Sequence, residues 1–156
     1  MIDEYELHQG IVLRQVIVGA NQPVRITPFN KRGRVNAFVL NEKIGVFIKH
    51  SSKRMSPWSF TFHLDQVSEL RELETVHSLS FISFVCGKDG VATINVEMFH
   101  QLVGFDEEPQ AWVRISRKPR TLYSFSGNRS NLPNKLAQGT ESICMALRAS
   151  HLGSDS

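Results

Sequence analysis

The alternation of apolar and polar residues divides the chain into segments of helical and of extended character. Residues 3–18 carry apolar side chains at mixed spacings of three and four, which predicts an amphipathic helix. Acidic side chains in its first turns suit the positive end of a helix dipole, and Gly19 marks its expected end. A polar segment with two prolines follows at 21–34 and predicts a loop, with room for a short strand at 24–27.

Three extended segments come next, and together they predict a three-stranded meander. Residues 36–41 and 44–50 are nearly continuous apolar runs on either side of a two-residue turn. This pattern is typical of a hairpin that is buried on both faces. Residues 58–63 alternate cleanly, so the three aromatic side chains of this third strand share one face.

The rest of the chain predicts a second helix, two further hairpins and a C-terminal helix. Asp65 is a good N-cap for a helix at 66–74, and an Asp-Gly pair suits the turn at 87–90. The remaining expected elements are strands at 79–86 and 91–96, a short helix at 97–102, strands at 111–116 and 120–125, and a helix at 136–147.

This order of elements predicts an α+β fold: a helix, a three-stranded meander, a helix, further β-hairpins and a C-terminal helix. The length of 156 residues suits one domain, which we place at 1–149 with a frayed tail at 150–156. No apolar run approaches the roughly 20 residues of a membrane helix, and the acidic start lacks the pattern of a secretory signal. We therefore expect a cytoplasmic protein that does not contact membranes.

Residue spacing argues against several chemistries. Cys86 and Cys144 are isolated, and the chain has no CxxC or CxxH pattern for zinc. The six histidines show no HExxH spacing. The GxxxxGK[ST] phosphate loop and the GxSxG nucleophile elbow are also absent from the sequence. We therefore expect buried thiols, no metal site and no cofactor.

Charge is distributed unevenly along the chain. Residues 14–54 carry nine basic side chains and one acid, residues 61–112 carry nine acids and two bases, and residues 113–156 carry seven bases and two acids. The net charge of +3 hides this segregation. Such a pattern indicates two surfaces of opposite sign, in which the basic stretch is either a solvated face or a phosphate-directed one.

Three basic segments are candidates for the phosphate-directed surface: the loop at 31–34, the connection at 50–58 and the hairpin at 114–120. In the second of them, Trp58 offers a stacking face in one interpretation and a core anchor in the other. The predicted nucleic-acid-binding residues are Lys31, Arg32, Arg34, Lys49, Lys53, Arg54, Trp58, Arg114, Arg117, Lys118 and Arg120.

The central hairpin resembles part of a known superfamily. The order helix, three strands, helix, strand is similar to the core of the PD-(D/E)XK nuclease-like superfamily, over about residues 35–102. That superfamily places an Asp at the start of the second core strand and a Glu-x-Lys or Gln-x-Lys on the third, and its acids hold Mg²⁺. Lys49 matches the lysine, whereas Asn36 and Phe47 stand where the acids would be. The resemblance implies a restriction-endonuclease-like core that lacks the metal-binding acids. The alternative fold is an unrelated α+β sandwich.

These observations favour a nucleic-acid-binding module without metal-dependent hydrolase activity, with DNA or RNA as its partner. One alternative is an enzyme: a nuclease with a relocated site, or a metal-independent ribonuclease. In the ribonuclease, His50 moves protons while Lys49 and nearby cations stabilise the phosphate. The other alternative is a protein–protein adaptor, regulator or inhibitor subunit whose acidic half docks a basic partner, and a homodimer is one form of it.

Overall fold

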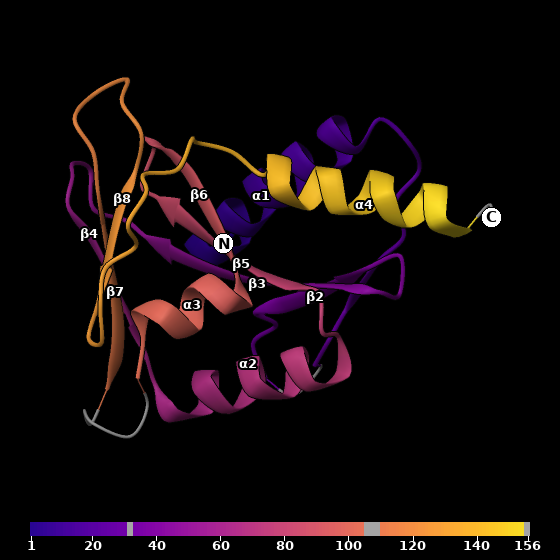
Figure 1. Ribbon diagram of the computed structural model, residues 1–156, viewed down its shortest axis with the longest axis horizontal. Helices are drawn as coiled ribbons and strands as arrows, with labels where there is room; N and C mark the ends of the chain where they lie inside the picture. The colour runs from indigo at the N-terminus through magenta and orange to yellow at the C-terminus, as the bar shows by residue number, and fades with distance from the viewer. Residues whose placement is uncertain (31–32, 105–109, 155–156) are drawn as a thin grey trace.

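The computed structural model describes residues 1–30, 33–104 and 110–154 and shows a mixed α+β fold (Figure 1). Within these residues there are four helices: α1 (Glu4–Ala20), α2 (Leu64–Val76), α3 (Val96–Leu102) and α4 (Glu141–Ser154). The strands are β1 (Ile26–Pro28), β2 (Ala37–Leu40), β3 (Ile44–Ser51), β4 (Trp58–Phe62), β5 (Ser80–Cys86), β6 (Gly90–Asn95), β7 (Ala111–Ser116) and β8 (Ser124–Gly127). In this part of the chain, none of the helices is long and apolar enough to cross a membrane.

Five strands form the larger sheet, in the order β1-β2-β3-β5-β6. The first three pair antiparallel, with Ala37 of β2 opposite Phe47 of β3. β3 and β5 run parallel, with Lys49 opposite Phe84, and β6 returns antiparallel to β5. Because β3 and β5 are parallel, their carboxyl ends lie together at one edge of this sheet.

Two apolar cores cover the two faces of the larger sheet. Successive residues of β3 divide between them, as the pleat of a strand requires. Val46 and Ile48 join the core under α1 and α4, whereas Phe47 joins the core shared with α2, α3 and the strands β4, β7 and β8. These last three strands form the second sheet. The molecule therefore has three layers: two helices, the larger sheet, and a layer that combines the second sheet with α2 and α3.

The strand at Trp58–Phe62 forms as predicted, but it does not continue the β2–β3 hairpin. It pairs with β7 in the second sheet, where Phe60 lies opposite Val113, and the neighbour of β3 is β5 instead. The predicted meander of these three segments is therefore wrong, and the meander that exists is β1-β2-β3. An alternating pattern indicates which face of a strand is buried, but not which strand will pair with it.

The start of α2 also differs from the prediction. Its N-cap is His63 rather than Asp65, and the backbone N–H of His63 donates to Gln66 Oε1 at 3.1 Å, so a side chain of the first turn holds the start of the helix. The hairpin β5–β6 and the short helix α3 are confirmed. The hairpin β7–β8 also forms, but its second strand is Ser124–Gly127 rather than 120–125, because the connection is longer than predicted and Arg120 within it has a φ of +64°. Both cysteines are buried, as expected.

The C-terminal helix begins later and extends further than the prediction of 136–147. Gly139 has a φ of +121°, and its backbone N–H donates to the carbonyl of Val91 on β6 at 2.7 Å. These residues are therefore extended against the sheet, and the helix starts only at Glu141. It continues to Ser154, beyond the start of the expected frayed tail.

Candidate nucleic-acid interface

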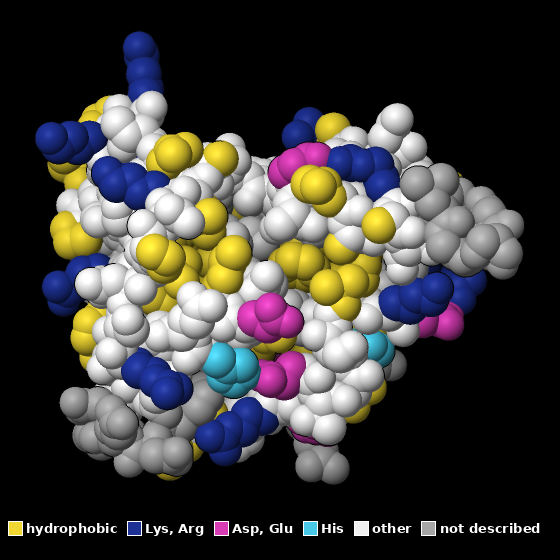
Figure 2. Space-filling view, viewed as in Figure 1, with side chains coloured by type: hydrophobic (Ala, Val, Ile, Leu, Met, Phe, Trp, Pro, Cys, Tyr) yellow, Lys and Arg dark blue, Asp and Glu magenta, His cyan; other side chains and the backbone are white. Residues whose placement is uncertain are grey.

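The second sheet and its connections collect basic charge from two distant parts of the chain. Residues 51–62 contribute two Lys or Arg and residues 111–140 contribute six, whereas neither range contains Asp or Glu. Pairing of β4 with β7 brings the two ranges together. Figure 2 shows Lys and Arg at the left end of the molecule, where this sheet lies, and further Lys and Arg beside Asp and Glu toward the right. We call residues 51–62 and 111–140 the basic layer.

Hydrogen bonds hold the loop before β4 against the turn after β7. Ser56 Oγ accepts from the backbone N–H of Arg117 at 3.1 Å, and Trp58 Nε1 donates to the carbonyl of Lys53 at 2.9 Å. Gly87, in the β5–β6 turn, approaches the same carbonyl so closely that an added Cβ would lie 2.3 Å from it. The second and third basic segments of the sequence therefore converge at one end of the molecule.

Arg117 is the cation that fixes the shape of this end. Its Nε lies 2.7 Å from Asp89 Oδ2, and its side chain is only 12% exposed. The hydroxyl of Tyr123 donates to the same carboxylate oxygen at 2.6 Å. Burial, together with this hydrogen bond to Asp89, raises the pKa of Tyr123. Arg117 thus forms an ion pair with Asp89, and the exposed cations of the turn are Lys118 and Arg120.

Trp58 is an interior residue, and the stacking interpretation of it is wrong. Its side chain is 2% exposed and packs edge-on against Tyr123, with ring centroids 6.2 Å apart. A buried ring has no free face for a base. The core-anchor interpretation of Trp58 is confirmed.

Lys49 also points inward. Its ammonium group donates to the carbonyl of Thr61 at 2.7 Å and to Gln66 Oε1 at 3.0 Å. Burial, with a smaller contribution from Arg34, lowers the pKa of Lys49 to about 8. The lysine therefore ties β3 to β4 and α2, which is a structural role rather than the phosphate contact predicted for it.

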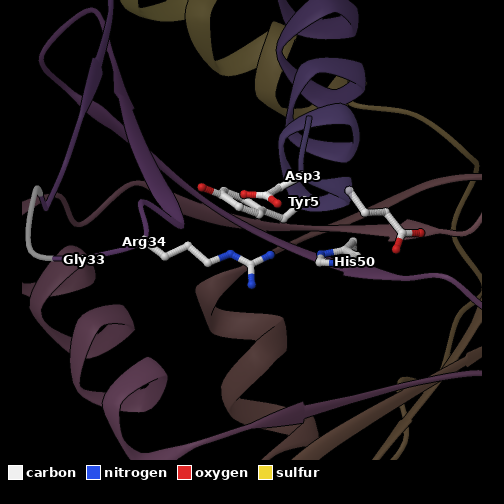
Figure 3. A pocket seen from close by; sticks show the side chains of 6 residues that line it. Asp3, Tyr5, Gly33, Arg34 and His50 are labelled. Carbon is white, nitrogen blue, oxygen red and sulfur yellow. The ribbon is translucent and has the colours of Figure 1, made fainter. Parts of the chain in front are cut away.

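A second group of polar residues lies where the carboxyl end of β3 meets the start of α1. Figure 3 shows the Arg34 side chain passing beside the ring of Tyr5 toward His50. The guanidinium carbon of Arg34 is 3.6 Å from the Tyr5 ring centroid. These residues line a hollow of about 660 Å³ together with Asp3 and Glu4.

His50 stacks on a second histidine that sequence reasoning does not associate with it. The rings of His8 and His50 lie 4.8 Å apart between centroids. His8 is 8% exposed, and its Nδ1 has no hydrogen-bond partner. Burial, with smaller electrostatic contributions from the neighbouring His8 and Arg34, lowers the pKa of His50. Neutral imidazoles of this kind can accept protons.

Glu4 and Ser52 connect this histidine pair to the basic layer. Glu4 Oε1 accepts from Ser52 Oγ at 2.6 Å, and this hydrogen bond lowers the pKa of Glu4. Arg54 and Lys88 line the neighbouring hollow with His8 and Ser52. Lys88 was not among the predicted contacts, because it stands in a turn signal between two acidic stretches of the sequence.

The residues at the nuclease-like positions do not fit a metal ion. Phe47 is fully buried in the core, and the amide of Asn36 donates to Glu69 Oε2 at 3.4 Å. Asn36 and Glu69 line a hollow together with Asp65 and Glu72. Burial raises the pKa of Glu69, and its two acidic neighbours raise it further. No group of three His, Cys, Asp or Glu able to hold a metal exists in the described ranges.

The other predicted contacts are dispersed. Lys31 and Arg32 lie outside the described residues, and Arg34 belongs to the hollow with His50. Arg114 lies on the outer face of the second sheet, where its Nε is 3.4 Å from Ser59 Oγ.

Comparisons with protein-family models, with curated proteins and with solved structures found no match.

Proposed function

We propose that the protein binds nucleic acid through the basic layer. The observation that carries this proposal is the concentration of eight Lys and Arg in residues 51–62 and 111–140, ranges without Asp or Glu of their own; one of the eight, Arg117, is paired with Asp89 of the β5–β6 turn. Two of these cations come from the first range and six from the second. Polyphosphate backbones bind such surfaces by releasing condensed counterions, so the charge balance itself supplies affinity. The exposed cations of the basic layer include two pairs of near neighbours in sequence: Lys53 with Arg54, and Lys118 with Arg120.

The topology supports a nuclease-like core as the scaffold of this module. With β4 assigned to the second sheet, the remaining order is α1, β1-β2-β3, α2 and β5. This keeps the order of helix, three strands, helix and strand, but β1 takes the place of the strand at Trp58–Phe62 that the sequence resemblance counted as the third strand. Asn36 directly precedes the second of these strands, and Lys49 lies on the third. Since the residues at the nuclease-like positions do not fit a metal, we propose binding without metal-dependent hydrolysis.

Fluorescence anisotropy with labelled single- and double-stranded DNA and RNA tests this function. We expect binding that weakens markedly between about 50 and 200 mM salt. The double variant Lys118→Glu, Arg120→Glu reverses two exposed charges of the basic layer and should weaken binding strongly. The matched control, Arg14→Glu with Lys43→Glu, changes the net charge equally at exposed positions outside the layer. Absence of binding to all four nucleic acids at low salt would refute the proposal.

A second candidate function is a metal-independent ribonuclease at the histidine pair. It is favoured by the stacking of His8 on His50 beside Arg34 and an open hollow. In this reaction His50 takes the proton of a ribose 2′-hydroxyl as its oxygen bonds to phosphorus. The bond from phosphorus to the 5′-oxygen breaks, His8 protonates the leaving oxygen, and Arg34 offsets the added negative charge.

Incubation with labelled RNA in the presence of a chelator separates this candidate from simple binding. We expect His50→Ala to reduce cleavage by about 100-fold or more. The control His63→Ser replaces an exposed histidine with a residue that also caps helices, so it should cleave normally. Unchanged cleavage by His50→Ala would remove His50 from the mechanism, and the absence of any cleavage would remove the candidate.

A further inference from the structure

The outer face of the second sheet is open. In Figure 1 this sheet stands at the left end of the molecule, and the helices α1–α4 all lie on its other side. The strands alternate between the two faces: Phe60 and Val113 are buried, whereas Ser59 and Arg114 are exposed. Among the described residues, no helix packs against the outward-facing side chains.

That face presents one aromatic ring and one cation among hydroxyl groups. Trp112 is partly exposed and lies opposite Thr61, while Arg114 lies opposite Ser59 on one side and Ser126 on the other. The guanidinium carbon of Arg114 is 5.7 Å from the Trp112 ring centroid. The outward-facing side chains, by alternation and register, are Ser59, Thr61, Trp112, Arg114, Ser116, Ser124 and Ser126.

The chemistry of this face selects among partners. A single aromatic ring among hydroxyls offers too little apolar area for a protein interface, whose buried centre is rich in apolar and aromatic side chains. Hydroxyl groups can donate to phosphates and to base edges, and a cation beside the ring adds attraction for a polyanion. An aromatic face stacks on an unpaired base, whereas the bases of a duplex are already stacked on one another.

The positive charge continues from this face toward the β7–β8 turn. Arg114 precedes the exposed residues Lys118 and Arg120 along the same hairpin, and residues 111–140 contain no acid to oppose them. A strand of nucleic acid with one base on Trp112 therefore has a basic path along the sheet for its phosphates.

We propose that the outer face of the second sheet binds single-stranded nucleic acid, with a base stacked on Trp112 and the backbone guided by Arg114 toward the β7–β8 turn. This inference rests on the proposed nucleic-acid-binding function, and it specifies the form of the nucleic acid and the surface that holds it.

The two tryptophans of the chain allow a direct test. Trp58 is 2% exposed, so quenching of tryptophan fluorescence by an added base reports on Trp112. Unlabelled oligothymidylate and oligouridylate of about 12 nucleotides, within the range of known site sizes, are titrated beside a duplex of equal length. Wild type and Trp58→Phe should both be quenched by the single strands. Trp112→Thr should lose the quenching and bind them about tenfold more weakly.

Further variants separate the possible outcomes. Trp112→Phe keeps an aromatic face and should retain more affinity than Trp112→Thr. If Trp112→Thr fails to fold, Arg114→Ser takes its place, since serine matches the neighbouring side chains, and it should weaken single-strand binding several-fold. Wild-type affinity in these variants, or tighter binding of the duplex, overturns the inference. If Lys118→Glu, Arg120→Glu still weakens binding in that case, the proposed function stands, whereas no binding by wild type overturns both.

Discussion

At the scale of single residues, the two tryptophans occupy opposite faces of the same sheet. Trp58 lies in the core with its indole N–H bound to the carbonyl of Lys53, whereas Trp112 is partly exposed. Trp58→Ala should therefore lower the free energy of unfolding by about 3–5 kcal/mol. Trp112→Thr should lower it by less, because part of its side chain is already exposed to solvent in the folded protein. Urea denaturation measures both, and equal losses would contradict this assignment of faces.

The buried ammonium of Lys49 makes a separate prediction about pH. Burial lowers the pKa of Lys49 from 10.5 to about 8 in the folded protein, while the unfolded chain keeps the ordinary value. Between these two values the unfolded chain binds a proton that the folded protein has lost, so stability rises with pH across this window and is flat below it. The unfolding free energy of wild type minus that of Lys49→Met should increase from pH 8 to 10.5. A constant difference in urea denaturation across that range would contradict the buried position.

For single residues, the sequence pattern predicts which face of a strand a side chain occupies better than it predicts which distant side chains it contacts. Alternation correctly predicted that Trp58 can anchor the core. It did not predict that the Lys49 side chain turns inward to Thr61 and Gln66, because that contact joins three elements. His8 was missed as the partner of His50, and its only signal was its place on the face of α1 that also buries Val12 and Val16.

At the scale of elements, the β5–β6 turn supports the loop that precedes β4. Gly87 has a φ of +56°, and a Cβ added to it would lie 2.3 Å from the carbonyl oxygen of Lys53. Gly87→Ala should destabilise the protein by about 1–3 kcal/mol, because the new Cβ must move backbone atoms and the φ is unfavourable. Gly10→Ala in α1 meets nothing within 4 Å and should stabilise by about 0.5–1 kcal/mol. Thermal unfolding measures the stability of both variants. An unchanged unfolding temperature for Gly87→Ala would contradict the close approach of Gly87 to the carbonyl of Lys53.

Most elements could be predicted from periodicity, whereas their partners could not. The strands at 44–50 and 79–86 are nearly continuous apolar runs because both faces of the larger sheet are covered, and this pattern is visible in the sequence. The pairing of β4 with β7 joins segments about fifty residues apart, and no local pattern specifies it. The start of α4 was misplaced because the hydrogen bond of Gly139 to Val91 competes with helix formation there.

At the scale of the whole molecule, charge that is grouped in the sequence is dispersed in space. Within the basic stretch 14–54, Arg14 lies on α1, Arg25 pairs with Glu42 at 2.5 Å, and Lys43 lies at the β2–β3 turn. Only Lys53 and Arg54 of this stretch belong to the basic layer. The presence of two surfaces of opposite sign stays a prediction, which now concerns the basic layer at 51–62 and 111–140 and the four acids of α2.

The measurement that tests the central claim most directly is the salt dependence of binding to a single strand. Each phosphate contact contributes about 0.7 to the slope of log K against log salt. Lys118→Glu, Arg120→Glu should lower the magnitude of that slope by about 1.4, while Arg14→Glu, Lys43→Glu should leave it at the wild-type value. Equal slopes for the two double variants would contradict a nucleic-acid interface on the basic layer.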